Sequence, residues 1–362
     1  MRTGYAQLPL HGGKAPRWLF QRMVRLAREI TVHVVSEYGS HEMLARLSDP
    51  YWFQAFGCVL GFDWHSSGVT TTTCGAVKEG LRGLEDGLGL YAAGGKGAAS
   101  RRTPAEIEQA CRALGCDASP LVRASRLSAK VDNSAVQDGH QLYHHCFFFT
   151  RDGRWCVVQQ GMDDARGTAR RYHWLGERVA DFVEEPHAAI CSQRPAATLN
   201  LVDRESRAAR QAMTELARQP DREVLRTLVR LPELRLPARH RLLAADVNPR
   251  HLQRILLKTY EQAPRDFSAL LGIPGVGAKT LRALALVAEL IYGTPASCRD
   301  PARFAFAHGG KDGTPFPVDR ETYDRTIGIL HDALHGAALE KADKRRALRR
   351  LADFARPGRT IS

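Results

Sequence analysis

The order of apolar and polar residues predicts helices at the start of the chain, followed by strands in the middle of its first half. One apolar face repeats at helical spacing over residues 18–38, through Leu19, Met23, Leu26, Ile30 and Val34. Further helices are expected over 40–47, 51–60 and 104–114, the last with Thr103 and Glu106 as a capping box. Strands are expected over 142–150 and 155–161, joined by an Asp-Gly turn, and the run 69–73 is also β-prone.

The second half of the chain is rich in Arg, Leu and Ala, and its periodicity is helical. The expected helices cover 203–219, 221–230, 239–245, 249–262, a pair ending at 292, 320–335 and 339–354. Pro195 and its small neighbours form an expected exposed linker over 194–198. The predicted organisation is therefore an α+β N-terminal domain at 1–195, carrying the chemistry, followed by an all-α domain at 200–362.

A glycine-rich hairpin, Gly272-Ile273-Pro274-Gly275-Val276-Gly277, separates the two helices of that pair. Ile273 and Val276 would anchor it in a core, while Gly272, Gly275 and Gly277 let another backbone approach closely. The first amides of the following helix have no intrahelical partner and form an anion site, with Lys279, Thr280 and Arg282 in the first turns. The stretch resembles the helix–hairpin–helix motif of DNA repair proteins, which implies sequence-independent binding of a phosphate backbone. The alternative is an αα-hairpin used only for packing or partner contact.

The charge of the chain points to the same class of partner. Its 362 residues carry a formal net charge of +13, with a pI of about 9.6, which favours a polyanion. A glycine-rich loop at 94–104 adds Lys96, Arg101 and Arg102 as candidate nucleic-acid contacts. DNA is the expected partner and RNA is not excluded. A generally basic proteome and a merely exposed loop are the competing explanations.

Carboxylates, histidines and amides crowd two stretches of the first half. The candidate catalytic residues are Asp63, His65, Asp132, Asp138, His140 and Gln160. Carboxylates hold hard divalent ions that activate water at a scissile phosphate, so Asp63, Asp132 and Asp138 are the candidate ligands of Mg²⁺ or Mn²⁺. Competing interpretations are a phosphodiester site without metal, a pocket for a flipped base, and aspartates that only cap turns.

Several other classes of protein are not indicated. The eight cysteines are scattered without a Cys-x-x-Cys pair, so neither a zinc ribbon nor a four-cysteine iron–sulfur run is expected. The N-terminus lacks the pattern of a signal peptide, and no run of about 18 apolar residues is present. We therefore expect a reduced, cytoplasmic protein that does not span a membrane.

Six phrases spread over the chain resemble one family. They are Leu8-Pro-Leu-His-Gly-Gly, Trp52-Phe-Gln-Ala-Phe-Gly, Asp63-Trp-His-Ser-Ser-Gly, Gly94-Gly-Lys-Gly, Lys130-Val-Asp-Asn and Phe304-Ala-Phe-Ala-His-Gly-Gly-Lys-Asp-Gly. Together they resemble the prokaryotic family catalogued as domain of unknown function 763, a resemblance that implies no activity.

The hairpin is also similar to that of DNA glycosylases of the endonuclease III type. That resemblance implies a nucleophilic Lys279 assisted by Asp319, although the gap between them is longer than usual and the family's frequent iron–sulfur cysteines are missing. Three hypotheses follow: a metal-dependent nuclease acting in DNA repair on duplex or branched DNA, a glycosylase or lyase, and a DNA-binding protein without catalysis.

Overall fold

The computed structural model describes residues 17–62, 68–192, 198–218, 249–303, 320–337 and 340–355. Asp63, His65 and Asp319 lie outside the described residues. So do residues 194–197 of the expected linker and the helices expected at 221–230 and 239–245. Thr198, the last residue of that linker, is buried instead of exposed.

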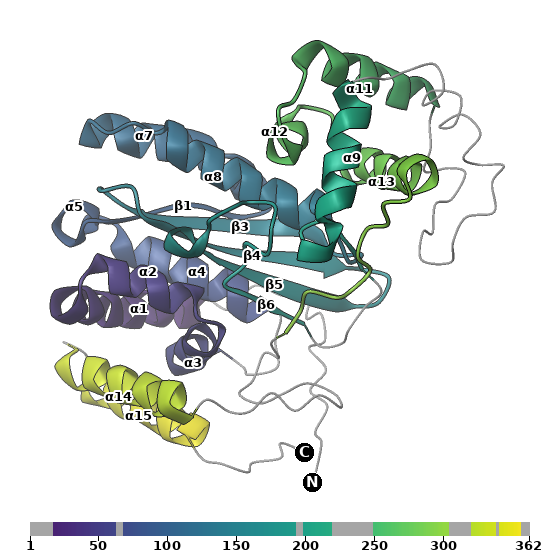
Figure 1. Cartoon of the computed structure of the whole chain (residues 1–362). Coiled ribbons are helices and arrows are strands. Elements are labelled where there is room, and N and C mark those ends of the chain that lie inside the picture. Colours follow the sequence, from purple (N-terminus) through teal and green to yellow (C-terminus); the bar gives the residue numbers. More distant parts are fainter. Residues whose placement is uncertain are drawn as a thin grey trace, which may run out of the picture.

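A five-stranded antiparallel sheet forms the centre of the molecule (Figure 1). Its strands, in spatial order, are β1 (Leu90–Lys96), β3 (Gln141–Thr150), β4 (Trp155–Asp163), β5 (Thr168–Leu175) and β6 (Ala189–Cys191). The strands expected at 142–150 and 155–161 are confirmed as β3 and β4, and Gly153 in the turn between them has φ +85°. A small second sheet pairs β2 (Val136–Gln137) with β7 (Leu199–Asn200).

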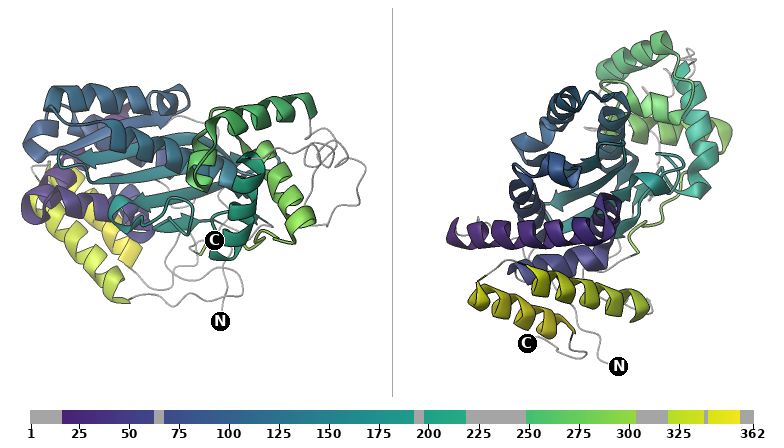
Figure 2. Two further views of the ribbon diagram at one scale, coloured as in Figure 1. Left: turned by 45° about the horizontal axis from the view of Figure 1, so that its top comes forward. Right: turned by 90° about the vertical axis from the view of Figure 1, so that its left-hand side faces the viewer.

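Helices from both ends of the chain cover one face of the sheet. They are α1 (Arg17–Tyr38), α2 (Ser40–Ser48), α3 (Pro50–Leu60), α4 (Gly68–Leu81), α14 (Arg320–Gly336) and α15 (Lys341–Ala355). α2 and α4 lie on the strands, and α1 packs on α4. α14 packs on α1 and α15 packs on α3, so the last two helices form an outermost layer (Figure 2). The expected helices at 18–38, 40–47 and 51–60 are thus confirmed.

A second group of helices covers the opposite face and continues beyond the end of the sheet (Figure 1). It comprises α7 (Thr103–Leu114), α8 (Ser119–Lys130), α9 (Arg207–Arg218), α11 (Pro249–Gln262), α12 (Phe267–Gly272) and α13 (Ala278–Tyr292). Five short turns complete the described elements: α5 (Glu85–Leu88), α6 (Ala98–Arg101), the π-helical turn Val131–Ala135 after α8, and two 3-10 turns at Gly176–Arg178 and Arg204–Ser206.

Alternation along β3 divides the core into two clusters, one on each face. Phe147 and Phe149 pack with α7, α8, α9 and α13, whereas Cys146 and Phe148 pack with α1 to α4, α14 and α15. The helices that follow residue 200 are therefore divided between the two faces. Residues from both 1–195 and 200–362 contribute to each of the two clusters. That the two ranges fold independently stays a prediction.

Two local expectations were wrong. Residues 69–73 lie in the first turns of α4 and form no strand. Val69 packs closely against α3: a Cβ added at Gly57 would lie 2.4 Å from Cγ2 of Val69. This packing overrides the β propensity of the segment. Thr103 and Glu106 form no capping box. Glu106 instead accepts hydrogen bonds from the Gly94 amide at 2.9 Å and from Lys78 Nζ at 2.6 Å, and so ties α7 to β1 and α4.

Candidate nucleic-acid interface

The hairpin between α12 and α13 has an apolar inner side and an open outer side. Ile273 and Val276 are buried, which confirms the expectation that they anchor it. Gly275 has φ +99°, a conformation that favours glycine. A Cβ added at Gly272 or Gly277 would meet no heavy atom within 4 Å. Another backbone can therefore approach the outer side without steric conflict.

Two residues, one on each side of the π-helical turn, hold the hairpin against the part of the chain that carries the sheet. Lys130 Nζ donates to the carbonyl of Val276 at 2.6 Å, and Gln137 Nε2 donates to that of Ala278 at 2.8 Å. Arg282 Nε donates to Gln137 Oε1 at 2.8 Å, so this predicted DNA contact has a structural partner. Burial lowers the pKa of Lys130. These contacts fix the orientation of the start of α13, while Lys279 remains exposed.

A row of basic residues on α8, not identified from the sequence, lies beside the hairpin. Arg123 and Arg126 are exposed and stand one turn apart, in line with Lys130. They line a groove of about 660 Å³ that reaches Gly272, together with Arg265, which is paired with Asp266 at 3.1 Å. The signal that could have found them is the spacing of Arg123, Arg126 and Lys130, three and four residues apart along an amphipathic helix.

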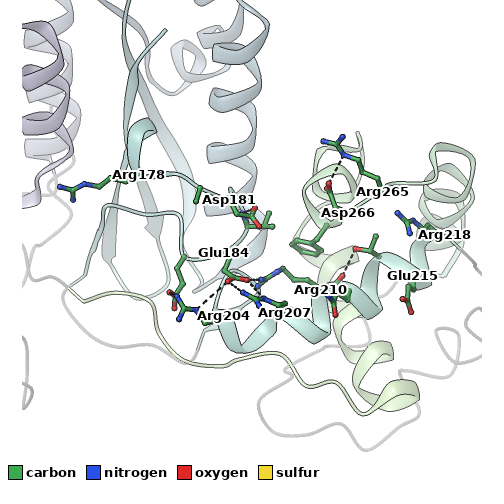
Figure 3. Close-up of a pocket in the computed structure, with 16 residues that line it drawn as sticks. Arg178, Asp181, Glu184, Arg204, Arg207, Arg210, Glu215, Arg218, Arg265 and Asp266 are labelled. Carbon is green, nitrogen blue, oxygen red and sulfur yellow. Dashed lines mark hydrogen bonds and ion pairs between the residues drawn. The ribbon is translucent and has the colours of Figure 1, made fainter. Parts of the chain in front are cut away.

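A larger groove nearby is basic in composition but is neutralised internally (Figure 3). Its arginines are Arg178, Arg204, Arg207, Arg210, Arg218 and Arg265, and its acids are Asp181, Glu184, Glu185, Glu215 and Asp266. Glu184 accepts hydrogen bonds from both Arg207 and Arg210, the latter at 2.6 Å. Because these charges already face each other, the groove offers a polyanion less than the α8 edge does.

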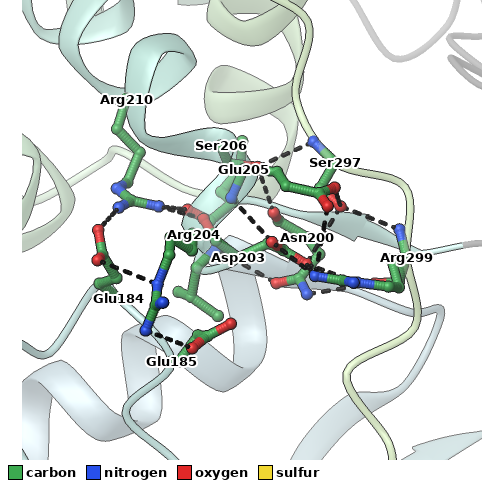
Figure 4. Close-up of polar contacts among 12 residues, drawn as sticks. Glu184, Glu185, Asn200, Asp203, Arg204, Glu205, Ser206, Arg210, Ser297 and Arg299 are labelled. Atoms are coloured by element: carbon green, nitrogen blue, oxygen red, sulfur yellow. Dashed lines mark hydrogen bonds and ion pairs between the residues drawn. The ribbon is translucent and has the colours of Figure 1, made fainter.

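The segment after α13 is attached to the base of α9 by a polar cluster (Figure 4). Asp203 accepts hydrogen bonds from the Ser297 hydroxyl and from Arg299, both at 3.2 Å. The Ser297 amide donates to Ser206 Oγ at 2.9 Å, and Asn200 Nδ2 donates to the carbonyl of Arg299 at 3.2 Å. This cluster orients the C-terminal end of α13 as Lys130 and Gln137 orient its beginning.

The other predicted nucleic-acid contacts lie elsewhere. Lys96 and Arg102 line a cleft with α1 and α4, on the face of the sheet opposite to α8, and Arg101 is exposed on α6. The hairpin residues and the glycine-rich loop therefore do not form one continuous surface around the α8 edge. Each has to be assessed as a separate site.

Asp132 lies in a buried hydrogen-bonded network. Its Oδ2 accepts from Trp174 Nε1 at 2.9 Å and from Gln159 Nε2 at 2.5 Å, and its Oδ1 lies 2.5 Å from His187 Nε2. Gln159 Oε1 in turn lies 2.7 Å from His145 Nδ1. Burial raises the pKa of Asp132, and the facing imidazole of His187 opposes that rise.

Asp138 belongs to a second buried network, centred on Arg170. Arg170 donates to Asp138 at 3.1 Å and to Asp300 at 2.5 Å, and Tyr172 donates to Asp138 at 2.6 Å. Burial alone would raise the pKa of Asp138, but the hydrogen bond from His140 and the charge of Arg170 hold that pKa below its usual value. The network joins β5 to the segment that follows α13.

The four described members of the predicted catalytic set, Asp132, Asp138, His140 and Gln160, are thus buried. Gln160 Nε2 donates to Tyr143 Oη at 2.5 Å, and His140 Nε2 lies 3.1 Å from Thr168 Oγ1. Within the described residues, no three His, Cys, Asp or Glu side chains converge as a metal-binding group. The structure shows these residues joining strands and helices, and their catalytic role stays a prediction.

The fold and this surface define a mixed helix-and-sheet protein with a glycine-rich hairpin next to exposed arginines. The chain belongs to the family described as "Protein of unknown function (DUF763)", whose model matches residues 4–318. Neither a curated protein nor a solved structure matches the chain. Among the described helices, none combines the length and apolar character needed to cross a membrane.

Proposed function

We propose that this protein binds the sugar–phosphate backbone of double-stranded DNA through the 272–277 hairpin and the adjacent edge of α8. The observation that carries the proposal is a hairpin with buried Ile273 and Val276, an open outer side, and exposed Arg123 and Arg126 beside it. The apolar residues of the hairpin pack in the core. The side left open consists of glycine backbone and a helix start.

The contacts expected at this surface neutralise phosphates. The first amides of α13 point out of the helix and carry the positive end of its dipole, which suits a phosphate oxygen. Arg123 and Arg126 can reach neighbouring phosphates from α8. None of these groups is presented on an element that would enter a groove and read base edges, so the binding is independent of sequence.

Affinity for a random duplex is expected to fall steeply with salt. Neutralising about 4–6 phosphates corresponds to a slope of log affinity against log salt near −4 to −5. Fluorescence anisotropy with a labelled 20-base-pair duplex, titrated from about 50 to 300 mM KCl, measures the slope. An affinity that does not change with salt would contradict the proposal.

The site is tested by adding a side chain to the open side of the hairpin. Gly277 has φ −137°, and a Cβ there meets nothing within 4 Å, so Gly277→Val should fold normally and weaken binding about 10-fold by holding the phosphate away. Gly87→Val is the matched control, because Gly87 is equally open but lies on α5, at the opposite end of the sheet (Figure 1). Equal affinities of the two variants would place the DNA elsewhere.

The α8 edge is tested by charge removal. Arg126→Gln is expected to weaken binding to all sequences alike and to reduce the salt slope by about 1. Arg151→Gln removes the same charge from the exposed β3–β4 turn, at the other end of β3 from the hairpin, and should leave the slope unchanged.

Catalysis goes beyond what the described surface supports, and both enzymatic hypotheses stay predictions. A metal-dependent nuclease would depend on Asp63 and His65 in addition to the buried residues, and its cleavage would stop in EDTA. A lyase using Lys279 and Asp319 would persist in EDTA and would be trapped on an abasic duplex by borohydride. A binding protein would cut in neither assay.

A further inference from the structure

A second basic site lies on the opposite face of the molecule from the hairpin. It is a cleft of about 1170 Å³ between α1, α4 and the end of β1. Its cationic lining residues are Arg22, Arg25, Lys78, Arg82, Lys96 and Arg102. Its size is sufficient for a nucleotide or a drug-sized ligand.

The positive charge of this cleft is only partly neutralised by protein. Lys78 and Arg102 share Glu106, Arg82 pairs with Glu79 at 3.3 Å, and Arg22 lies 3.8 Å from Asp343. Glu79 and Glu106 are the acids in the lining. Arg25 and Lys96 are exposed and have no ion-pair partner among the described residues. The cleft therefore holds cations in excess that face solvent, in contrast to the paired groove of Figure 3.

An aromatic ring stands among these cations. Trp18 lines the cleft and is 59% exposed, with the guanidinium of Arg22 5.4 Å from its ring centre. An exposed tryptophan in a cleft with an excess of cations suits a ligand that has both a flat ring and negative charge. Base stacking on such a ring combined with phosphate contacts is the usual chemistry of single-stranded nucleic-acid binding.

Below the cleft lies the buried side chain of His144, which has no hydrogen-bond partner within the described residues. Cys146 lines the cleft, and His144, two residues before it, lies on the same face of β3. His144 is 1% exposed, and neither ring nitrogen has a hydrogen-bond partner within the described part of the chain. Buried polar atoms rarely stay unpaired in proteins, which is consistent with a ligand or water completing this region.

We propose that the cleft between α1, α4 and β1 binds an unpaired nucleotide, with its base on Trp18 and its phosphate between Arg25 and Lys96. The nucleotide can come from the end of a nucleic-acid strand or from a free nucleoside phosphate. The site is separate from the hairpin surface, so it can be present whether or not the hairpin binds duplex DNA.

Fluorescence anisotropy with a labelled, 5′-phosphorylated hexathymidylate tests this inference on the full chain. Trp18→Ala is expected to weaken binding at least 5-fold through lost stacking, and Lys96→Gln and Arg25→Gln about 3-fold each. All three side chains are exposed, so the variants should fold, which circular dichroism checks; if one does not, the other two still decide. Arg151→Gln, in the exposed β3–β4 turn away from both proposed surfaces, is the control and should leave this affinity unchanged.

Competition distinguishes the two sources of the nucleotide. Displacement of the hexathymidylate by ATP supports a free nucleotide, whereas binding that ATP does not displace supports a strand end. The inference is overturned if the three cleft variants bind as the unchanged chain does, if Arg151→Gln loses as much affinity as they do, or if hexaglutamate displaces the probe as well as hexathymidylate does.

Discussion

Replacing Arg170 by methionine is expected to lower the free energy of unfolding by about 3–5 kcal/mol, the cost of removing one partner from a buried ion pair. Arg170 is fully buried between Asp138 and Asp300. Without its guanidinium, Asp138 would keep a negative charge in the interior, with Tyr172 and the His140 amide as its remaining donors and the His140 ring 3.3 Å away. Urea unfolding followed by circular dichroism measures the loss.

Arg166→Met is the matched control for this substitution. Arg166 lies in the loop before β5, its side chain is 56% exposed, and its ion pair with Asp163 is 3.5 Å long. Exposed pairs of this kind contribute little, so the change should stay within about 0.5 kcal/mol. Similar losses in the two variants would show that Arg170 is not the buried centre of its network.

The same network bears on the metal-site hypothesis. If Asp138 were a ligand of an empty site, Asp138→Asn would fold with an undiminished melting temperature in EDTA and lose any stabilisation by Mn²⁺. Because Asp138 is held by Arg170, Tyr172 and His140, we expect the melting temperature to fall in EDTA instead. An undiminished melting temperature together with a lost metal response would restore the metal hypothesis.

Acid is expected to destabilise the protein well above the range in which carboxylates titrate. Burial lowers the pKa of His145 to about 4, and burial together with His145 and Lys96 lowers that of His144 to about 3. Unfolded histidine titrates near 6.5. Between these values the unfolded chain binds more protons than the folded one, so stability falls as the pH decreases. Each residue should account for a loss of about 2 kcal/mol at pH 5 relative to pH 7.

The contribution of one histidine can be isolated by substitution. His145→Gln removes a titrating ring but keeps a polar group near Ser125 and Gln159, so the difference in unfolding free energy between pH 7 and pH 5 should shrink by about 2 kcal/mol. His331→Gln, whose side chain is 54% exposed, should leave that difference as it is. An unchanged difference in His145→Gln would mean that the ring is already charged in the folded state.

Much of the local structure could be predicted, because its causes lie within a few residues of one another. The helical repeat of Leu19 to Val34 forms α1, and Asp49 accepts hydrogen bonds from the Tyr51 and Trp52 amides at the start of the expected helix α3. The strands β3 and β4 and the Asp-Gly turn between them could also be predicted from the sequence. At the hairpin, the apolar and glycine positions correctly predicted which residues are buried.

The candidate site was harder to predict, because its residues acquire their roles from distant partners. The exposed edge of α8 lies beside the hairpin because Lys130 donates a hydrogen bond to Val276, 146 positions away. In the sequence alone, Asp132 and Asp138 resemble metal ligands, because the groups that bind them are distant along the chain. His187 is 55 positions from Asp132, and Arg170, which binds Asp138, also binds Asp300 across 130 positions. A carboxylate is a ligand or a structural acceptor according to what surrounds it.

The sequence by itself thus determined the helices at 18–38, 40–47 and 51–60, the hairpin and the strands β3 and β4, because helical periodicity, capping and turn chemistry act over short distances. Only the tertiary structure decided that α14 and α15 return to the core of the first helices, that residues 69–73 are helical, and that Lys96 faces a different cleft from the hairpin. These outcomes depend on which faces pack together, and burial in a common core outweighs the propensity of any single segment.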